Sequence, residues 1–265
     1  MKRFRGKELH ERPWFPRLWR DELTEFLSFF ARHSGVYRPA LDKIAAFMRD
    51  PEIPAVYTDL CAGAGGYELG FVRKLRKLTG RGVQARLTDL YPNAHWEKLA
   101  ALGQGGITAV CTSLPASQAV ADYEGCSVMF SGLHHFDPEE LRNIITIAAK
   151  RRRTLVFCDY SRRSVAEEFL PMLFAVPFMI VTAPLVWPFS WKRLLFTWVL
   201  PVLPLLLWID GWLSRLRAYH PDELRKIVAE LELPSGTHWE VVRLPVFFHI
   251  GEVTCLTVSP KMPEK

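Results

Sequence analysis

The chain has 265 residues, of which 49% are hydrophobic and 23% charged, which suits one large globular domain or one domain with an insertion. Its net charge of +6 and pI near 9.1 come from short basic clusters, which suit anionic lipid and nucleic acid equally well, so composition does not choose between them. Five scattered cysteines without a Cys-x-x-Cys pair argue against a complete disulfide framework, and the N-terminal residues lack the apolar run of a secretory signal. These features predict a cytoplasmic protein.

Apolar periodicity predicts two helices followed by alternating strands and helices. Helical spacing covers residues 21–31 and 38–50. From residue 55 onward, short apolar strands alternate with helix-like segments, which is typical of a parallel sheet with helical crossovers. Strands are expected at 55–60, 83–88, 107–111, 126–130 and 154–158, and helices at 67–78, 94–101 and 138–150.

The last part of the chain predicts a helix at 221–231 and an antiparallel pair of strands at 239–244 and 253–258. The predicted fold class is therefore α/β. It has a doubly wound, mostly parallel sheet that ends in an antiparallel hairpin, with N-terminal helices and an apolar helical insertion after strand five. The expected divisions are an N-terminal helical cap (1–54), a Rossmann-like core (55–164), an apolar insertion (165–217) and a C-terminal helix with the closing hairpin (218–265).

A turn of small residues follows the first predicted strand. Asp59 ends the strand, and Gly63 and Gly65 precede the next helix. Small residues let the backbone approach a ligand, and the helix N-terminus offers unpaired N–H groups. A dinucleotide-binding turn has the spacing G-x-G-x-x-G, but the third position counted from Gly63 is Glu68, which weakens a nicotinamide interpretation. A glycine-rich turn that binds no cofactor remains the alternative.

Two further features lie at the ends of later strands. Asp89 ends strand two, where a carboxylate can bind both hydroxyls of a ribose, although an acid there can also cap a loop. Ser131 and the paired His134 and His135 follow strand four, at the sheet edge where ligands bind in this fold class. A structural hydrogen bond is the alternative role for each histidine. No spacing typical of a metal site stands out.

The motif Asp59-x-Cys61-x-Gly63-x-Gly65, then Asp89, then Leu133-His134-His135-Phe136, resembles the successive motifs of the Rossmann-like (class I) S-adenosylmethionine-dependent methyltransferase superfamily. The resemblance covers about residues 55–159 and the closing hairpin. It implies that S-adenosylmethionine is the cofactor and that Asp89 binds its ribose. The residues it places around the cofactor are Asp59, Cys61, Gly63, Ala64, Gly65, Asp89, Thr112, Ser113 and Ser131.

The sequence departs from the superfamily pattern at two places. Cys61 stands where glycine is usual, and Thr112-Ser113 replaces the acidic residue often found after strand three. Methyl transfer from a sulfonium depends mainly on positioning, and it needs a general base only if the acceptor must lose a proton. His134 and His135 are the catalytic candidates on the acceptor side.

Residues 169–190 and 194–209 carry no charged side chain. Each run is interrupted by prolines, which break or kink helices, although about twenty residues suffice to span a bilayer. Basic pairs flank the insertion and occupy its tip at Lys192-Arg193. A kinked hairpin dipping into one leaflet would keep these pairs near anionic head groups, whereas two spans would carry the tip across. True spans and a soluble lid or dimer surface are the alternatives.

Together these features predict a methyltransferase that acts on a hydrophobic or lipid-like acceptor at the inner face of the membrane. Nucleic acid is not expected as a partner, because the basic clusters flank apolar sequence and no Asn/Asp-Pro-Pro-Tyr/Phe motif of base-modifying enzymes is present. A catalytically inactive membrane-bound scaffold of the same fold and a nicotinamide-dependent oxidoreductase are the alternatives.

Overall fold

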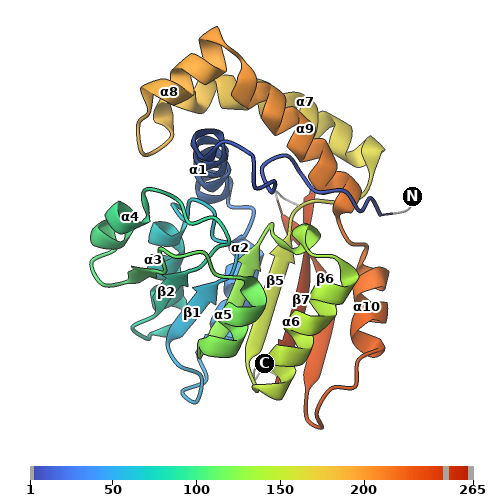
Figure 1. The fold of residues 1–265 in the computed structure, drawn as a ribbon. Helices are drawn as coiled ribbons and strands as arrows, with labels where there is room; N and C mark the ends of the chain where they lie inside the picture. The colour runs from blue at the N-terminus through green and yellow to red at the C-terminus, as the bar shows by residue number, and fades with distance from the viewer. Residues whose placement is uncertain (1–2, 247–250, 262–265) are drawn as a thin grey trace.

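A seven-stranded mixed sheet forms the centre of the computed structural model, which describes residues 3–246 and 251–261 (Figure 1). The strand order is β3-β2-β1-β4-β5-β7-β6, and β1 to β5 pair in parallel. β7 lies antiparallel between β5 and β6, so the predicted closing hairpin is confirmed. The strands are β1 (Val56–Asp59), β2 (Gln84–Leu87), β3 (Ile107–Ala109), β4 (Cys126–Phe130), β5 (Thr154–Asp159), β6 (His238–Val246) and β7 (Gly251–Ser259).

The helices agree with the sequence pattern except for one short element. α5 was not predicted, because its buried residues include only Ala116, Ala119 and Val120 and give no strong apolar periodicity. The N-cap of α6 is Asp137, whose side chain accepts hydrogen bonds from the backbone N–H groups of Glu139 and Glu140. The helices are α1 (Arg17–Ser34), α2 (Arg38–Met48), α3 (Glu68–Thr79), α4 (Trp96–Leu102), α5 (Ala116–Asp122), α6 (Pro138–Lys150), α7 (Val165–Thr182), α8 (Trp191–Leu194), α9 (Val202–Arg217) and α10 (Pro221–Ala229).

Both faces of the sheet are covered, which explains why β4 and β5 are apolar without alternation. Val128 and Phe130 pack on the side of α2 and α3, whereas Met129 packs with residues of α6 on the other side. The central strands are therefore held by two cores, and their carboxyl ends meet at one edge.

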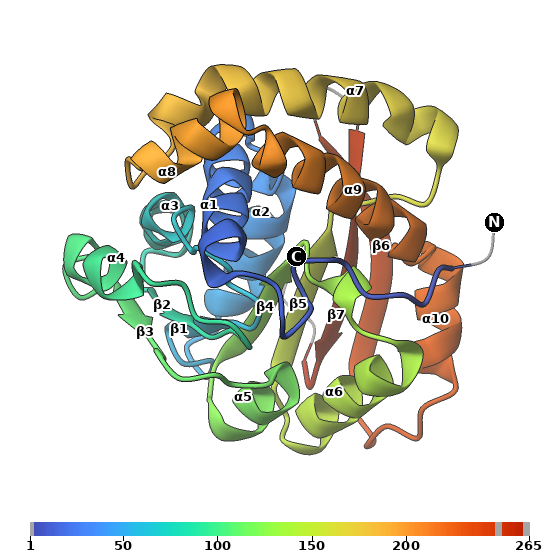
Figure 2. The same cartoon turned by 45° about the horizontal axis from the view of Figure 1, so that its top comes forward.

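The insertion, residues 165–217, lies across that edge and over α1 (Figures 1 and 2). α7 and α9 pack against each other, and one face of the pair contacts α1 through Phe26, Met179 and Leu203. Among the described residues, α7 and the 3-10 helix that follows it (Ala183–Leu185) form one helical window, Glu168–Leu185, that is long and apolar enough to cross a membrane. The second half of the insertion is bent by 80° between Trp191–Val199 and Val202–Arg217.

The predicted contact of Arg193 with head groups is wrong. Its side chain is fully buried, and its guanidinium pairs with Glu25 and, at 2.8 Å, with Glu22 of α1. A buried guanidinium needs such partners, because its desolvation is otherwise uncompensated. The tip of the insertion is thus anchored to the N-terminal helix by ion pairs, while Lys192 beside it is exposed.

Candidate functional site

The glycine turn has the backbone geometry that its composition predicts. Gly63 and Gly65 adopt positive φ angles of 52° and 67°. A Cβ at Gly65 would lie 2.9 Å from Leu87 Cδ1, so the turn packs closely on the end of β2. Only glycine accommodates both the left-handed backbone and this approach without strain.

Asp59 lies beneath the turn in a buried polar network. The Tyr67 hydroxyl donates to Asp59, and the Tyr57 hydroxyl donates to Glu68, the first residue of α3. Burial raises the pKa of both carboxyls, most strongly that of Glu68, which donates a hydrogen bond to Asp59. The predicted cofactor residue Asp59 is fully buried and enclosed by protein groups, and we name this set the tyrosine–carboxyl cluster.

Asp89 connects the glycine turn to the loop after β2. Its carboxylate accepts hydrogen bonds from the backbone N–H of Gly63 at 2.9 Å and from that of Tyr91 at 2.8 Å. A neighbouring cavity of about 220 Å³ is lined by Tyr91 and Cys111, and by Arg20 of α1. The predicted ribose residue Asp89 and the predicted cofactor residues Thr112 and Ser113 therefore share one side of the sheet edge. Thr112 and Ser113 are exposed there, and the Ser113 hydroxyl donates to the Leu90 carbonyl at 2.7 Å.

Cys61, one of the two departures from the superfamily pattern, has a structural counterpart in Gly132. A Cβ at Gly132 would lie 3.0 Å from the Cβ of Cys61, so glycine after β4 makes room for the larger residue after β1. Ala64 is buried within the turn. Ser131 adopts a positive φ of 51°, and its hydroxyl bonds to that of Tyr37, the residue that precedes α2.

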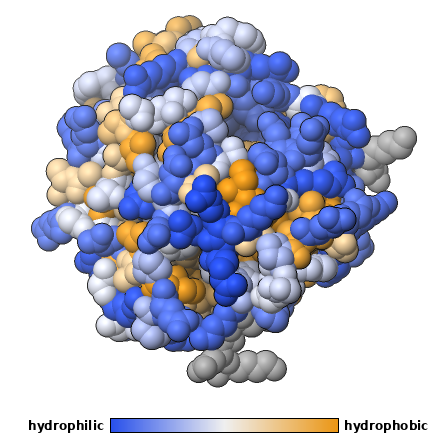
Figure 3. Space-filling view, turned by 60° about the horizontal axis from the view of Figure 1, so that its bottom comes forward, coloured by the Kyte–Doolittle hydropathy of each residue, from blue (hydrophilic) through white to orange (hydrophobic). Residues whose placement is uncertain are grey.

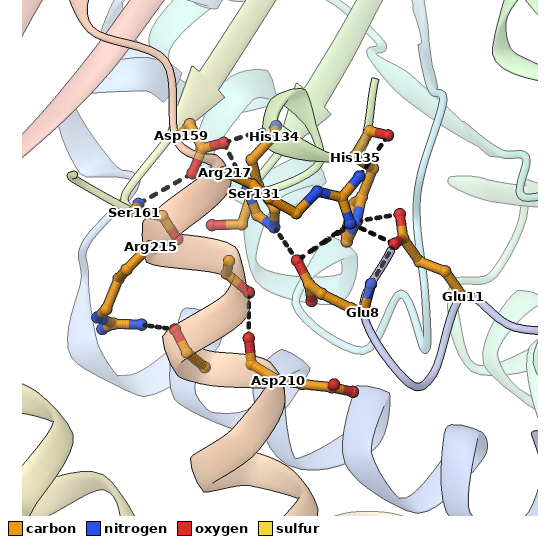
Figure 4. Close-up of polar contacts among 12 residues, drawn as sticks. Glu8, Glu11, Ser131, His134, His135, Asp159, Ser161, Asp210, Arg215 and Arg217 are labelled. Carbon is orange, nitrogen blue, oxygen red and sulfur yellow. Dashed lines mark hydrogen bonds and ion pairs between the residues drawn. The ribbon is translucent and has the colours of Figure 1, made fainter. Parts of the chain in front are cut away.

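His134 and His135 lie on a short 3-10 helix after β4 and face a second buried cluster (Figure 4). His134 Nδ1 lies 2.7 Å from Asp159 Oδ2, and its Nε2 lies 3.3 Å from Glu8 Oε1. The flanking carboxylates outweigh the desolvation and raise the pKa of His134 to about 10. The histidines in turn hold the pKa of Glu8 at about 2, against the effect of burial.

Sequence reasoning missed the residues that complete this second cluster. Glu8 and Glu11 come from the segment before α1, and Arg217 comes from the end of α9. The Arg217 guanidinium donates to Glu11 and to the His135 carbonyl, and Glu11 Oε1 lies 2.8 Å from His135 Nδ1. We name the set Glu8, Glu11, His134, His135, Asp159 and Arg217 the histidine–carboxylate cluster.

Asp210 of α9 fixes the N-terminal segment over this cluster. It accepts hydrogen bonds from the backbone N–H groups of Leu9 and His10 and faces His10 Nδ1 at 2.9 Å. Two sequence signals were available: the dense run Glu8-Leu9-His10-Glu11, and a lone acid at the end of an otherwise apolar run. A buried carboxylate in an apolar helix needs a polar partner, so the position of Asp210 predicts a polar contact with another segment of the chain.

Comparison with known proteins shows similarity in structure alone. No protein-family model matches the sequence, and no curated protein matches it significantly. The plantazolicin methyltransferase BpumL, solved with S-adenosylhomocysteine, aligns with 92% of this chain and 96% of its own at a TM-score of 0.51 and 7% identity. Human N-acetylserotonin methyltransferase, solved with S-adenosylmethionine, aligns with 97% of this chain and 60% of its own at a TM-score of 0.50 and 10% identity.

An O-methyltransferase (NcsB1) from neocarzinostatin biosynthesis, solved with S-adenosylmethionine and 2-hydroxy-5-methyl naphthoic acid, aligns with 89% of this chain and 56% of its own. Its TM-score is 0.49 and its identity 14%. The chain thus spans less than two thirds of the length of this protein and of the human enzyme. The strand order and the alignments with BpumL and the human enzyme show that the chain has the fold of the class I S-adenosylmethionine-dependent methyltransferases.

Proposed function

We propose that the protein is an S-adenosylmethionine-dependent methyltransferase that acts on a hydrophobic or lipid-like acceptor at a membrane surface. The observation that carries the methyltransferase proposal is the meeting of the Gly63–Gly65 turn with Asp89 at the crevice beside β1 in a sheet of this order. Ligands of open α/β sheets bind in that crevice, at the carboxyl ends of the strands.

The residues present fit the cofactor better than they fit a dinucleotide. Gly63 and Gly65 leave their turn without side chains, and Asp89 supplies a half-buried carboxylate beside them. The third glycine of a dinucleotide turn is replaced by Glu68, whose buried carboxyl fills the space beneath the helix. The cofactor would supply an activated methyl group, and Asp89 would bind its ribose.

The acceptor side is formed by the histidine–carboxylate cluster and the insertion above it. The proposal that His134 and His135 act there stays a prediction. Both ring nitrogens of His134 face carboxylates, which stabilise a positive charge and so disfavour proton abstraction by this ring.

The proposal of a membrane surface rests on where apolar side chains are exposed. Of the 22 large hydrophobic side chains exposed in the described part of the chain, 16 lie between residues 169 and 205. Trp191 and Val181 are 77% and 73% exposed. The face brought forward in Figure 3, away from the insertion, is mostly hydrophilic, with apolar residues in separated groups. A concentrated apolar surface marks an interaction site.

Calorimetry with S-adenosylmethionine, S-adenosylhomocysteine and NAD tests the cofactor. We expect both sulfur nucleotides to bind and Asp89→Asn to weaken them about 10- to 100-fold, as loss of a charge-assisted hydrogen bond predicts. Asp122→Asn, at the exposed end of α5, is the matched control. Binding of NAD alone would favour an oxidoreductase, and binding of none of the three would favour a scaffold.

Liposome flotation tests whether the exposed apolar surface of the insertion binds a membrane. The variant Phe174→Ser/Val181→Ser/Trp191→Ser should lose flotation with anionic vesicles, whereas Leu102→Ser/Trp239→Ser removes exposed apolar side chains elsewhere and should keep it. Equal flotation of both variants would contradict the membrane proposal. Incubation with labelled cofactor and a total lipid extract, followed by extraction of the labelled product, tests the acceptor class.

A further inference from the structure

The histidine–carboxylate cluster contains a buried carboxylate oxygen without a hydrogen-bond partner. Glu8 is only 1% exposed, and its Oε1 accepts no hydrogen bond in the described structure. Ion pairs to His134 Nε2 at 3.3 Å and to Arg217 Nη1 at 3.7 Å offset its charge, but neither replaces the hydrogen bonds that the oxygen loses with its water. The side chains of His134, His135 and Arg217 point toward this oxygen from other parts of the chain (Figure 4). This convergence indicates that a further group binds between them.

The distances around Glu8 suit a shared cation better than direct hydrogen bonds. Glu8 Oε1 lies 3.3 Å from His134 Nε2 and 3.8 Å from His135 Nδ1, and the three atoms lie within 4.8 Å of one another. Ligand bonds of about 2.0–2.1 Å in tetrahedral geometry place two ligand atoms roughly 3.3–3.4 Å apart. The 3.3 Å separation of Glu8 Oε1 and His134 Nε2 matches this spacing, and His135 Nδ1, 3.8 Å from Glu8 Oε1, would move slightly closer to bind the same ion.

His134 also has the supporting contact that metal-binding histidines require. Its Nδ1 faces Asp159 Oδ2 at 2.7 Å, which turns Nε2 toward Glu8 and fixes the ring. Asp159 is itself held, because it accepts hydrogen bonds from the backbone N–H groups of His134 and Ser161. A carboxylate behind a ligating histidine orients the ring and raises its basicity.

The charge balance points the same way. Glu8, Glu11 and Asp159 contribute three negative charges, Arg217 contributes one positive charge, and the protonated His134 contributes another when no ion is bound. A divalent cation that replaces the proton on His134 Nε2 brings this sum to zero and leaves the imidazole neutral, as ligation requires. The neighbouring set of Glu8, His10 and Asp210 is a weaker candidate, since Asp210 is already satisfied by two backbone N–H groups and by His10.

We propose that Glu8, His134 and His135 bind one divalent transition-metal cation of the zinc class. Two imidazoles and one carboxylate are a ligand set that Zn²⁺ accepts, and three protein ligands leave a position for water or another oxygen ligand. Glu11 Oε1 lies 2.8 Å from His135 Nδ1 in the absence of the ion. When His135 Nδ1 binds the ion, this contact would break and Glu11 would lie beside the ion. The site joins the N-terminal segment to the loop after β4.

Zinc titration of the EDTA-treated full chain, with a chromophoric chelator as competitor, tests this site. We expect one Zn²⁺ per chain and a rise in Tm on binding. His135→Gln is the principal variant because this ring is the more exposed of the two, so its loss disturbs the fold least; it should raise the Kd about 100-fold or more. His33→Gln/His238→Gln, which removes two exposed imidazoles, is the matched control and should bind as the wild type does.

Co²⁺ substitution gives a second, spectroscopic readout of the same site. Absorption bands of a low-symmetry nitrogen and oxygen site, without a thiolate charge-transfer band, should appear at one equivalent. Glu8→Gln should abolish these bands in protein that circular dichroism shows to be folded. Absence of a one-to-one ion in the wild type, or an ion that His135→Gln binds with unchanged affinity, would overturn the proposal.

Discussion

The two buried acid clusters at the carboxyl edge of the sheet both bury carboxyl groups, but one favours their neutral form and the other their ionised form. In the tyrosine–carboxyl cluster, Asp59 and Glu68 are surrounded by hydroxyl groups, and burial raises the pKa of both. In the histidine–carboxylate cluster, Glu8 is equally buried, yet the neighbouring imidazoles of His135, His134 and His10 lower its pKa to about 2. Burial alone therefore does not decide the charge of a carboxyl; its neighbours do.

Removing one charge from the histidine–carboxylate cluster should produce the largest effect. Asp159→Asn leaves the imidazole of His134 with a weaker partner, and we expect a loss of about 3–5 kcal/mol, as when one partner of a buried ion pair is removed. Urea unfolding in EDTA measures it, with Asp122→Asn as the control. A loss below about 1 kcal/mol would mean that ion pairing within this cluster contributes little to the stability of the fold.

The tyrosine–carboxyl cluster should tolerate a neutral replacement. Glu68→Gln keeps a donor for Asp59 and an acceptor for Tyr57, so its free energy of unfolding should fall by less than about 1 kcal/mol. Glu68→Ala leaves both partners unpaired and should cost about 2–3 kcal/mol. The same unfolding measurement compares the two variants. If they are equally destabilised, Glu68 is charged in the folded protein and the contrast between the clusters fails.

The clusters should also differ in the direction of their pH dependence. The lowered pKa of Glu8 contributes stability that is present above its unfolded value near 4.5 and is lost as the pH falls toward 2. In EDTA, the stability gap between wild type and Glu8→Gln should shrink by about 2 kcal/mol from pH 6 to pH 3. The corresponding gap for Glu68→Gln should not shrink on acidification, since a raised pKa favours folding at low pH.

The smallest predicted effect concerns the contact between the two loops, Cys61 with Gly132. Gly132→Ala places a methyl group 2.8 Å from Met129 Cγ and 3.0 Å from Cys61 Cβ and should cost about 1 kcal/mol through overpacking. The double variant Cys61→Gly/Gly132→Ala should recover part of this loss. A double-mutant cycle from thermal unfolding measures the coupling, and strict additivity would show that the two residues do not compensate each other.

The sequence was most informative where structure is local. The glycine turn, Asp89 and the strands β4 and β5 follow from spacing and composition over a few residues. Arg193 was misplaced because its partner Glu25 is 168 residues away in the chain. Glu8 was missed for the same reason, since the N-terminal segment has no periodicity and its partners lie on the loop after β4 and on α9. Charge pairing over such separations leaves no pattern in a sequence.

The long separation between Glu11 and Arg217, 206 residues, also has a consequence for biosynthesis. A ribosome that adds about 5–20 residues per second needs roughly 10–40 s to make the intervening chain. During that time Glu8 and Glu11 lack Arg217, the backbone of the N-terminal segment lacks Asp210, and α1 lacks the apolar side chains of α7 and α9 that cover it. The nascent chain therefore exposes two unpaired carboxylates and the apolar face of α1, and we expect chaperones to bind it until α9 emerges.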